Sequence, residues 1–171
     1  MQNILIVVDM QNDFIDGALG TPEAVLIVPT VRDVILSHNG KVIFTKDTHS
    51  PDYLSTNEGK NLPVEHCIRG TYGWEICDSL KEYANEVIEK PTFGSTTLAD
   101  LLKAEHKKSP IGKITLVGLC TDICVISNAL LLKATLPEVE IEVISGACAG
   151  VTNESHQNAL NAMKMCQITI K

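Results

Sequence analysis

Residues 114–125 read Ile-Thr-Leu-Val-Gly-Leu-Cys-Thr-Asp-Ile-Cys-Val, and they join an apolar β-type run to a long apolar helical pattern that begins near Ile123. Cys124 stands where this predicted strand turns into the predicted helix. The unpaired N–H groups and the positive end of a helix favour a thiolate over a thiol at such a turn. The stretch therefore indicates a strand–helix unit that carries a cysteine nucleophile. The alternative is that Cys124 is a small buried apolar residue, because free cysteines are often buried.

The same alternation of strand and helix runs along the whole chain. We expect strands over residues 3–8, 41–45, 85–89, 113–118, 139–144 and 167–170. We expect helices from the cap at Thr21 to Gly40, over 75–83, from Ser95 to about 107, from about 123 to 134, and from the cap at Thr152 to 165. Residues 50–74 show little pattern, and so long a loop in a compact domain is usually functional. The alternation predicts an α/β fold with one doubly wound, mostly parallel six-stranded sheet and helices on both faces.

Length and composition restrict the class of protein. The chain has 171 residues, which predicts one domain over residues 1–171. Acidic residues outnumber basic ones by 21 to 14, the net charge is −7, and no Lys/Arg-rich patch is present. Nucleic acid and anionic membrane surfaces are therefore not expected partners. Neither a signal peptide nor an apolar run of about 18 residues is found, which predicts a cytoplasmic protein with reduced cysteines.

Reactive side chains follow four of the predicted strands. Asp9, Asp47, Lys90 and Cys124 each fall at or just after the carboxyl end of a different strand. Open α/β sheets bind their ligands outside these ends. Asp9 follows an aliphatic run and needs a cation, for which Lys90 is the natural candidate. A carboxylate beside Cys124 can accept the thiol proton, and an ammonium can stabilise the thiolate. The alternative is a structural Asp–Lys pair that closes the sheet edge.

A second group of polar residues has the composition of a metal site. Asp47 and His49 lie on the same side of an extended segment, and Glu58 and His66 come from the loop that follows. Imidazole and carboxylate ligands suit a divalent ion, with zinc expected first and iron or manganese as alternatives. Taken alone, the two histidines are more often ordinary loop residues. His156 lies in a helical pattern, and we expect it to be structural.

Three motifs together resemble the isochorismatase-like cysteine hydrolases, over essentially the whole chain. They are Asp9-Met10-Gln11-Asn12-Asp13-Phe14, Lys90 followed by Phe93-Gly94-Ser95, and Val117-Gly118-x-x-Thr121-Asp122-x-Cys124-Val125. The pair Asp47-x-His49 with the later Pro63-x-x-His66-Cys67 is similar to the metal-binding branch of that family, the nicotinamidases.

The resemblance implies a particular site and reaction. It implies a catalytic triad of Asp9, Lys90 and Cys124, a metal held by Asp47, His49 and His66 with Glu58 as a fourth ligand, a cis peptide bond between Leu119 and Cys120, and an oxyanion hole formed by the N–H groups of Cys120 and Cys124. The implied reaction is hydrolysis of the carboxamide of nicotinamide, through a cysteine thioester, to nicotinic acid and ammonia. A homo-oligomer and a place in NAD salvage are implied as well. Phe14 is the expected stacking wall for the ring, and Leu62 its expected border.

Two positions depart from the nicotinamidase pattern, and both concern the pocket. Leu62 stands where the branch often has Trp, and Cys120 stands where it often has Ala. The alternative function is therefore a different small-amide hydrolase of the same family, acting on a ureido or carbamoyl group. Cleavage of a vinyl ether is disfavoured because it needs no nucleophilic cysteine. A non-catalytic binding module is disfavoured because it would not need Asp, Lys and Cys together.

Overall fold

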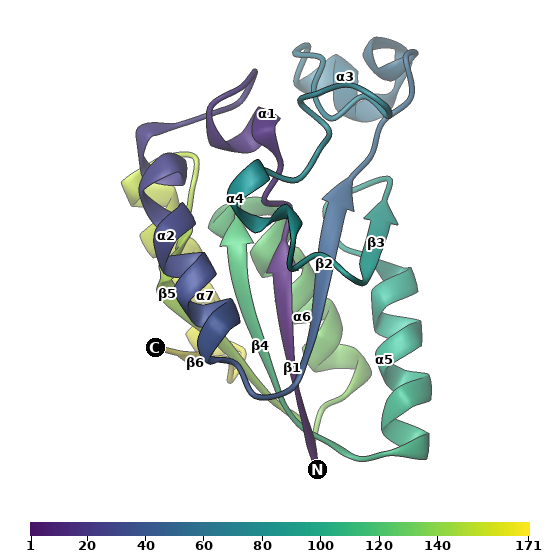
Figure 1. The fold of residues 1–171 in the computed structure, drawn as a ribbon, viewed down its shortest axis with the longest axis vertical. Helices are drawn as coiled ribbons and strands as arrows, with labels where there is room; N and C mark the ends of the chain where they lie inside the picture. The colour runs from purple at the N-terminus through teal and green to yellow at the C-terminus, as the bar shows by residue number, and fades with distance from the viewer.

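Six parallel strands form the centre of the molecule in the computed structural model, which describes residues 1–171 (Figure 1). The strands are β1 (Gln2–Val8), β2 (Lys41–Asp47), β3 (Val87–Lys90), β4 (Ile111–Leu119), β5 (Glu140–Ala149) and β6 (Thr169–Ile170). Their order across the sheet is β3-β2-β1-β4-β5-β6, and every neighbouring pair is parallel. The predicted α/β fold is confirmed, and the sheet is wholly rather than mostly parallel.

Helices connect these strands. They are α1 (Asn12–Ile15), α2 (Pro22–Ser37), α3 (Asn57–Asn61), α4 (Asp78–Lys81), α5 (Thr96–Lys108), α6 (Ile126–Thr135) and α7 (Asn153–Met165), with a 3₁₀ turn η1 (Tyr53–Ser55) and a π-helical turn η2 (Thr121–Val125). The side chains of Thr21, Ser95 and Thr152 each accept a hydrogen bond from the backbone N–H three residues further on. These caps stabilise the first turns of α2, α5 and α7. No helix combines the length and the apolar composition that a membrane span requires.

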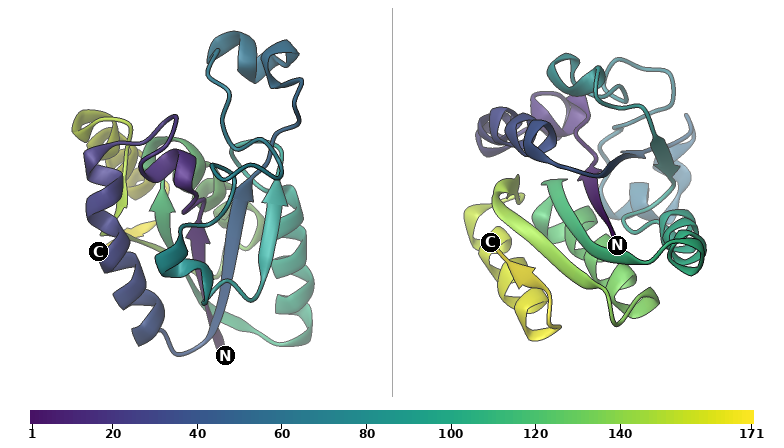
Figure 2. Two further views of the ribbon diagram at one scale, coloured as in Figure 1. Left: turned by 45° about the horizontal axis from the view of Figure 1, so that its top comes forward. Right: turned by 60° about the horizontal axis from the view of Figure 1, so that its bottom comes forward.

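The central strand β1 is buried on both of its faces. Ile4 and Ile6 pack in one apolar cluster with side chains of α5, α6 and α7. Leu5 and Val7 point the other way and pack with side chains of α1 and α2. Because alternate side chains of a strand point to opposite faces, an unbroken aliphatic run fills two cores at once. The prediction of helices on both faces is confirmed. The right view of Figure 2 shows one layer of helices on each side of the sheet.

Some short elements differ from the prediction. The helix expected over 75–83 is reduced to the four residues of α4, and the helix expected from about 123 begins with η2 before α6 starts at Ile126. The loop expected over 50–74 contains η1 and α3, and the sequence did not predict α1. The reason is visible in α3, whose sequence Asn-Glu-Gly-Lys-Asn has no apolar side. Without an apolar stripe a helix leaves no periodic signal in the sequence.

The topology leaves a crevice at the carboxyl ends of the strands. The chain runs outward from β1 to β2 and β3, then crosses back to place β4 on the other side of β1. Loops leaving β1 and β4 therefore diverge, which is the point where doubly wound sheets bind ligands. Gly118 in β4 has a φ of 114°, and a Cβ atom there would overlap the carbonyl oxygen of Val8. Only glycine permits this close approach of the two strands at the crevice.

The buried carboxylate of Glu142 on β5 bonds to side chains on β4 and to the C-terminal residue of the chain. The Glu142 Oε1 atom accepts a hydrogen bond from the Thr115 hydroxyl at 2.8 Å and lies 3.1 Å from the Lys113 ammonium. The Oε2 atom lies 3.2 Å from the ammonium of Lys171. Burial opposes ionisation, but the Thr115, Lys113 and Lys171 donors together lower the pKa of Glu142 below its ordinary value.

We predict that Glu142→Gln lowers the thermal midpoint at pH 7 by a few degrees, since one lost charged hydrogen bond is worth about 1–2 kcal/mol and about 2–4 °C per kcal/mol in a chain of this size. Because the folded-state pKa is lowered, the carboxylate stabilises the fold above its ordinary pKa of 4.5 and loses that effect as the pH falls through the folded-state value. The thermal midpoints of wild type and Glu142→Gln should therefore become equal at acid pH. Glu140→Gln, an exposed position on the same strand, is the control, and an equal deficit at pH 3 would contradict the assignment.

Candidate active site and metal centre

Lys90 is the hub of a buried polar cluster at the crevice. Its ammonium lies 2.6 Å from Asp9 Oδ2, 3.3 Å from the Cys124 sulfur and 3.4 Å from Asp47 Oδ1. It also donates to the carbonyl oxygen of Thr92 at 3.0 Å. The side chains of Asp9 and Lys90 have no solvent exposure, and Cys124 is buried. The structure thus brings together the three residues that the sequence proposed as a triad.

The strand ends place the two charged members. Asp9 follows β1 in a left-handed conformation, with a φ of 46°. Its N–H donates to the Thr45 carbonyl at 3.2 Å, and its Oδ1 accepts from the Thr45 hydroxyl at 2.6 Å. The other oxygen, Oδ2, has no further partner beyond the ion pair with Lys90. That oxygen therefore has the free lone pair that a general base needs.

The turn that carries Cys124 is tightly wound. The peptide bond between Leu119 and Cys120 is cis, as the resemblance implies. The N–H groups of Ile123 and Val125 donate to the Cys120 carbonyl at 3.1 and 3.0 Å. Cys124 lies between these two donors in the first turn of the helical segment.

Helix α7 and the residues just before it contact this turn. The Thr121 hydroxyl and His156 Nδ1 are 2.7 Å apart. Both carboxylate oxygens of Asp122 accept from the Val151 N–H at 3.2 Å. The expected structural role of His156 thus takes the form of a hydrogen bond to the turn that carries Cys124.

Burial controls the protonation of the cluster. Burial, together with the nearby charge of Asp9, raises the pKa of the Cys124 thiol well above its ordinary value. Burial likewise raises the pKa of Asp9, which makes it a stronger base than a solvated carboxylate. Burial would lower the pKa of Lys90, but the negative charges of the neighbouring Asp9 and Asp47 carboxylates raise it. The resting site therefore holds a thiol beside an ammonium. This differs from the thiolate expected at a helix start, because desolvation outweighs the field of the helix end.

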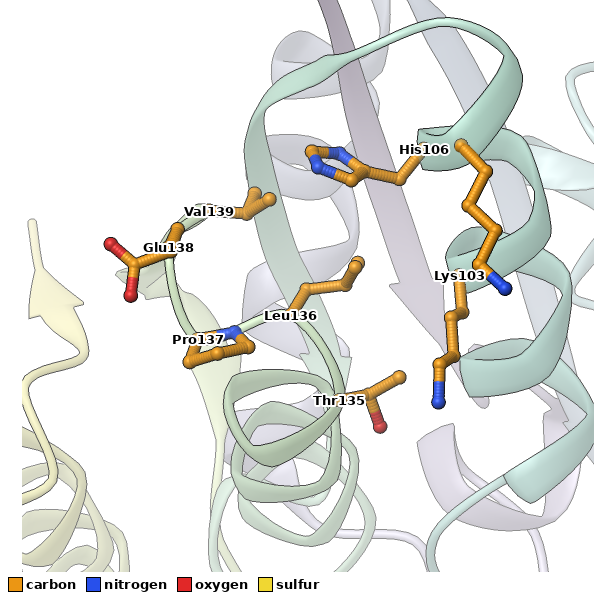
Figure 3. A pocket seen from close by; sticks show the side chains of 8 residues that line it. Lys103, His106, Thr135, Leu136, Pro137, Glu138 and Val139 are labelled. Atoms are coloured by element: carbon orange, nitrogen blue, oxygen red, sulfur yellow. The ribbon is translucent and has the colours of Figure 1, made fainter.

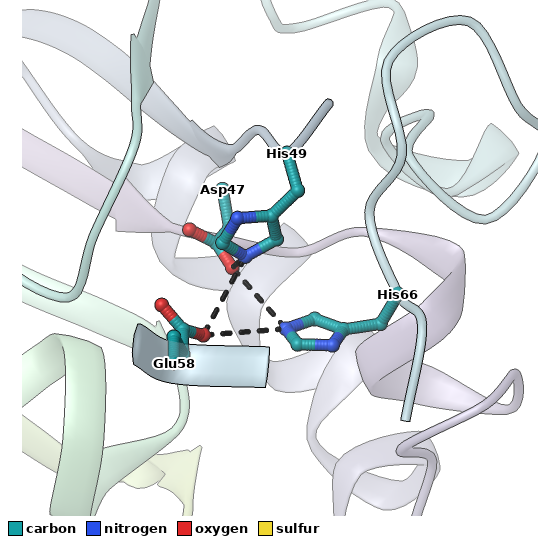
Figure 4. A group of neighbouring side chains, drawn as sticks. All are labelled: Asp47, His49, Glu58 and His66. Carbon is teal, nitrogen blue, oxygen red and sulfur yellow. Dashed lines mark hydrogen bonds and ion pairs between the residues drawn. The ribbon is translucent and has the colours of Figure 1, made fainter. Parts of the chain in front are cut away.

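Four ligand-type side chains meet beside this cluster (Figure 4). Asp47, His49, Glu58 and His66 each offer one donor atom, and these atoms lie within 4.8 Å of one another. His49 Nε2 is 3.0 Å from Asp47 Oδ2 and 3.5 Å from Glu58 Oε1. The Nδ1 atom of His66 is 2.8 Å from the Val64 carbonyl oxygen, which fixes that nitrogen as the donor and leaves Nε2 free to act as a ligand. Two imidazole nitrogens and two carboxylate oxygens fit a divalent transition metal.

Residues that the sequence did not assign hold these ligands in place. The buried Gln11 amide donates to the Asp47 carbonyl and accepts from the Asp47 N–H, both at 2.8 Å. Asp13 Oδ2 accepts from the N–H of Cys67, the residue after His66, at 2.7 Å. Gln11 and Asp13 belong to the motif that begins at Asp9. Their place in that motif was the only sequence feature that could have indicated this supporting role.

The four side chains of Asp47, His49, Glu58 and His66 form the metal cluster. The ring of Tyr53 packs on one side of it. Its centroid lies 4.7 Å from that of His49 and 5.0 Å from that of His66. Its hydroxyl donates to the Leu62 carbonyl at 2.9 Å. Tyr53 is fully buried although it belongs to the segment that the sequence described as a loop. No sequence signal pointed to this contact.

A small cavity lies between the thiol and the metal cluster. Its volume is about 40 Å³, and its lining residues are Phe14, Leu19, Asp47, Glu58, Leu62, His66, Phe93, Cys120, Ile123 and Cys124. Phe14 and Leu62 were expected there, whereas Leu19, Phe93 and Ile123 were not. A wider cleft of about 510 Å³ shares Glu58, Leu62, Phe93 and Ile123 with the cavity and lies beside α3. The lining of the cavity is therefore mostly apolar, and its ionisable groups are Asp47, Glu58, His66 and the two thiols of Cys120 and Cys124.

A separate hollow lies between the carboxyl ends of α5 and α6 (Figure 3). It measures about 250 Å³ and is lined in part by Lys103, His106 and Lys107. Basic residues in the last turn of a helix complement its negative end. The hollow includes none of the residues of the triad or the metal cluster.

Comparison with known proteins agrees with the geometry. The family described as isochorismatase domain matches residues 3–171. The chain belongs to the isochorismatase domain family. Among its relatives, a nicotinamidase of Schizosaccharomyces pombe is 30% identical over 206 residues, covering 97% of this chain and 91% of the relative.

Solved structures of other proteins share this fold. The pyrazinamidase of Pyrococcus horikoshii in complex with zinc is 29% identical with a TM-score of 0.85, covering 100% of this chain and 99% of that one. The N-carbamoylsarcosine amidase of Thermoplasma acidophilum is 29% identical with a TM-score of 0.79, covering 100% and 96%.

We predict that His66→Ala weakens zinc binding, measured by titration calorimetry, by more than about 100-fold. Gln11→Ala should cost about 10–100-fold, because partners that orient a metal ligand are typically worth that much. His38→Ala is the control, since this residue lies at the end of α2, away from the cluster. Zinc affinity unchanged in His66→Ala would show that the four side chains do not form the metal site.

Proposed function

We propose that this protein hydrolyses nicotinamide to nicotinic acid and ammonia through a thioester on Cys124. The observation that carries the proposal is the contact of a buried Asp9–Lys90–Cys124 cluster with a four-residue metal cluster through the Lys90–Asp47 ion pair. Both clusters contribute residues to one small cavity, Cys124 from the first and Asp47, Glu58 and His66 from the second. The likeness to a nicotinamidase and to a zinc-bound pyrazinamidase supports it.

Asp47, His49, Glu58 and His66 would hold the metal, with zinc expected first. When bound, the ion would supply a Lewis acid that orients and polarises the pyridine ring. Phe14 gives the ring an aromatic wall, and Leu62 borders the cavity. Cys124 also lines the cavity and would present its sulfur to the carboxamide carbon.

The first half-reaction needs one proton transfer and one nucleophile. Asp9 Oδ2 accepts the Cys124 thiol proton, and the sulfur forms a bond to the carboxamide carbon while the Lys90 ammonium stabilises the developing negative charge on sulfur. The carbonyl electrons move to oxygen, which the N–H groups of Cys120 and Cys124 stabilise. When the carbonyl re-forms, the C–N bond breaks and the departing nitrogen takes the proton from Asp9, so that ammonia leaves and a thioester remains.

The second half-reaction reverses these roles. Asp9 accepts a proton from water, whose oxygen attacks the thioester carbon. The C–S bond then breaks, and the sulfur regains a proton from Asp9. The products are nicotinic acid and the free Cys124 thiol. The raised pKa values of Asp9 and Cys124 suit this shuttle, because the proton passes between two groups that both bind it strongly.

A second candidate is hydrolysis of a carbamoyl or ureido amide, which the likeness to N-carbamoylsarcosine amidase favours. Leu62 and Cys120, the two departures from the nicotinamidase pattern, both line the cavity and concern the substrate rather than the reaction. We rank this candidate second because an acyclic substrate without a ring nitrogen has no evident use for the metal cluster. Cytoplasmic location, a homo-oligomeric state and a role in NAD salvage stay predictions.

We predict that the zinc-loaded protein releases ammonia from nicotinamide, and that a strong chelator stops the release until zinc is restored. Coupled ammonia detection measures the rate, and an equal concentration of N-carbamoylsarcosine serves as the comparison substrate. Release from the carbamoyl compound alone would replace nicotinamide with the second candidate. Release from nicotinamide that the chelator leaves unchanged would remove the metal from the mechanism.

We predict that Cys124→Ala lowers kcat by at least about 10⁴-fold, the usual cost of removing a nucleophile. Asp9→Asn should lower kcat by about 10²–10⁴-fold, the usual contribution of a general acid–base group. Cys166→Ala is the control, because this exposed thiol lies at the end of α7. Normal turnover by Cys124→Ala would exclude the thioester mechanism.

A further inference from the structure

Asn128 is a buried amide that the proposed mechanism does not use. It lies on α6, one turn after Cys124, and its exposed fraction is 1%. Its Oδ1 accepts from the Ser95 N–H at 2.9 Å. Its Nδ2 donates to the Phe93 carbonyl at 3.1 Å and to the Cys124 carbonyl at 2.8 Å. All three partners are backbone atoms. The Asn128 side chain therefore fixes backbone positions and not the position of another side chain.

These three bonds join two segments that carry different parts of the site. One is the turn of Cys124. The other is the connection between β3 and α5, which begins just after Lys90 and contains Phe93, a wall of the cavity. In the same connection the Thr92 carbonyl accepts from the Lys90 ammonium at 3.0 Å. Asn128 therefore links the segment that holds the ammonium to the segment that holds the thiol.

The distance between the Lys90 ammonium and the Cys124 sulfur is important for the proposed chemistry. The Lys90 ammonium lies 3.3 Å from the Cys124 sulfur although the two residues are 34 positions apart. A misplacement of about 1 Å between catalytic groups can cost about 100-fold in rate. Apolar packing could fill the space of Asn128, but it could not fix two backbone carbonyls and one N–H at set positions, because dispersion contacts have no direction.

We propose that Asn128 is a positioning residue that sets the Lys90–Cys124 contact and the place of the Phe93 wall by binding both backbone segments. The inference rests on the proposed function for its kinetic readout. It has a second readout, the reactivity of the Cys124 thiol, that does not require nicotinamide to be the substrate.

Two substitutions of Asn128 remove different sets of its three hydrogen bonds. Asn128→Ala removes all three hydrogen bonds. Asn128→Ser keeps a hydroxyl that can bond the carbonyl four residues earlier, as Ser127 does with Ile123 at 2.6 Å, but it cannot reach Phe93 and Ser95 together. Ser127→Ala is the matched control, since it removes a hydrogen bond within the helix and leaves the bonds of Asn128 intact.

The experiment measures kcat and KM for nicotinamide and the rate at which iodoacetamide alkylates Cys124, read by mass spectrometry of the digested zinc-loaded protein. All measurements are made well below the melting temperature of each variant. We expect Asn128→Ala and Asn128→Ser to lower kcat by about 10–100-fold, with a smaller change in KM. Alkylation of Cys124 should slow by a comparable factor, and Ser127→Ala should stay within about twofold of wild type in both measurements.

Wild-type kcat and alkylation in folded Asn128→Ala and Asn128→Ser would overturn the proposal, even if their melting temperatures fall. Failure of both variants to fold would overturn it too, because Asn128 would then support the fold as a whole. If wild-type protein does not hydrolyse nicotinamide, the proposed function fails, and the alkylation rates alone decide the role of Asn128.

Discussion

The burial of the Lys90 ammonium is the constraint on which the site depends. An unpaired charge in a protein interior is very costly, so Lys90 requires anionic partners at fixed positions. Asp9 supplies one at 2.6 Å and Asp47 another at 3.4 Å. Asp47 also presents its second oxygen to His49 at 3.0 Å. One carboxylate thus couples the cysteine cluster to the metal cluster, and a change in either half alters the charge balance of the other.

The sheet explains how these partners meet. Asp47 and Lys90 are register partners at the ends of β2 and β3, and Asp9 follows β1 in the adjacent position. Parallel strands bring their carboxyl ends to one edge, so residues far apart in the chain converge without any special contact between them. The crossing from β3 to β4 adds Cys124 from the far side of β1. The fold therefore provides the approximate geometry before any side chain is considered.

Buried or partly buried polar side chains that bind the backbone then refine this geometry. Gln11 pairs with both backbone groups of Asp47, Asp13 holds the N–H after His66, and Asn128 joins the turn of Cys124 to the connection after β3. Each satisfies its own hydrogen-bonding capacity by fixing a backbone segment that carries a functional residue. A buried polar group must find partners, and here the partners are the segments of the site.

The sequence by itself determined the parallel α/β fold and the candidate residues, because aliphatic runs, caps and motifs are local signals. It also predicted the four candidate metal ligands that the structure brings together, since two of them are neighbours in one extended segment and all are typical ligand types. It could not predict that Tyr53 packs on both histidines or that Asn128 bridges two loops, because these contacts join residues without any shared pattern. The protonation of Cys124 was likewise decided by the tertiary structure. A helix start favours a thiolate, but the thiol is buried beside Asp9, and desolvation depends on every residue that excludes water from the site.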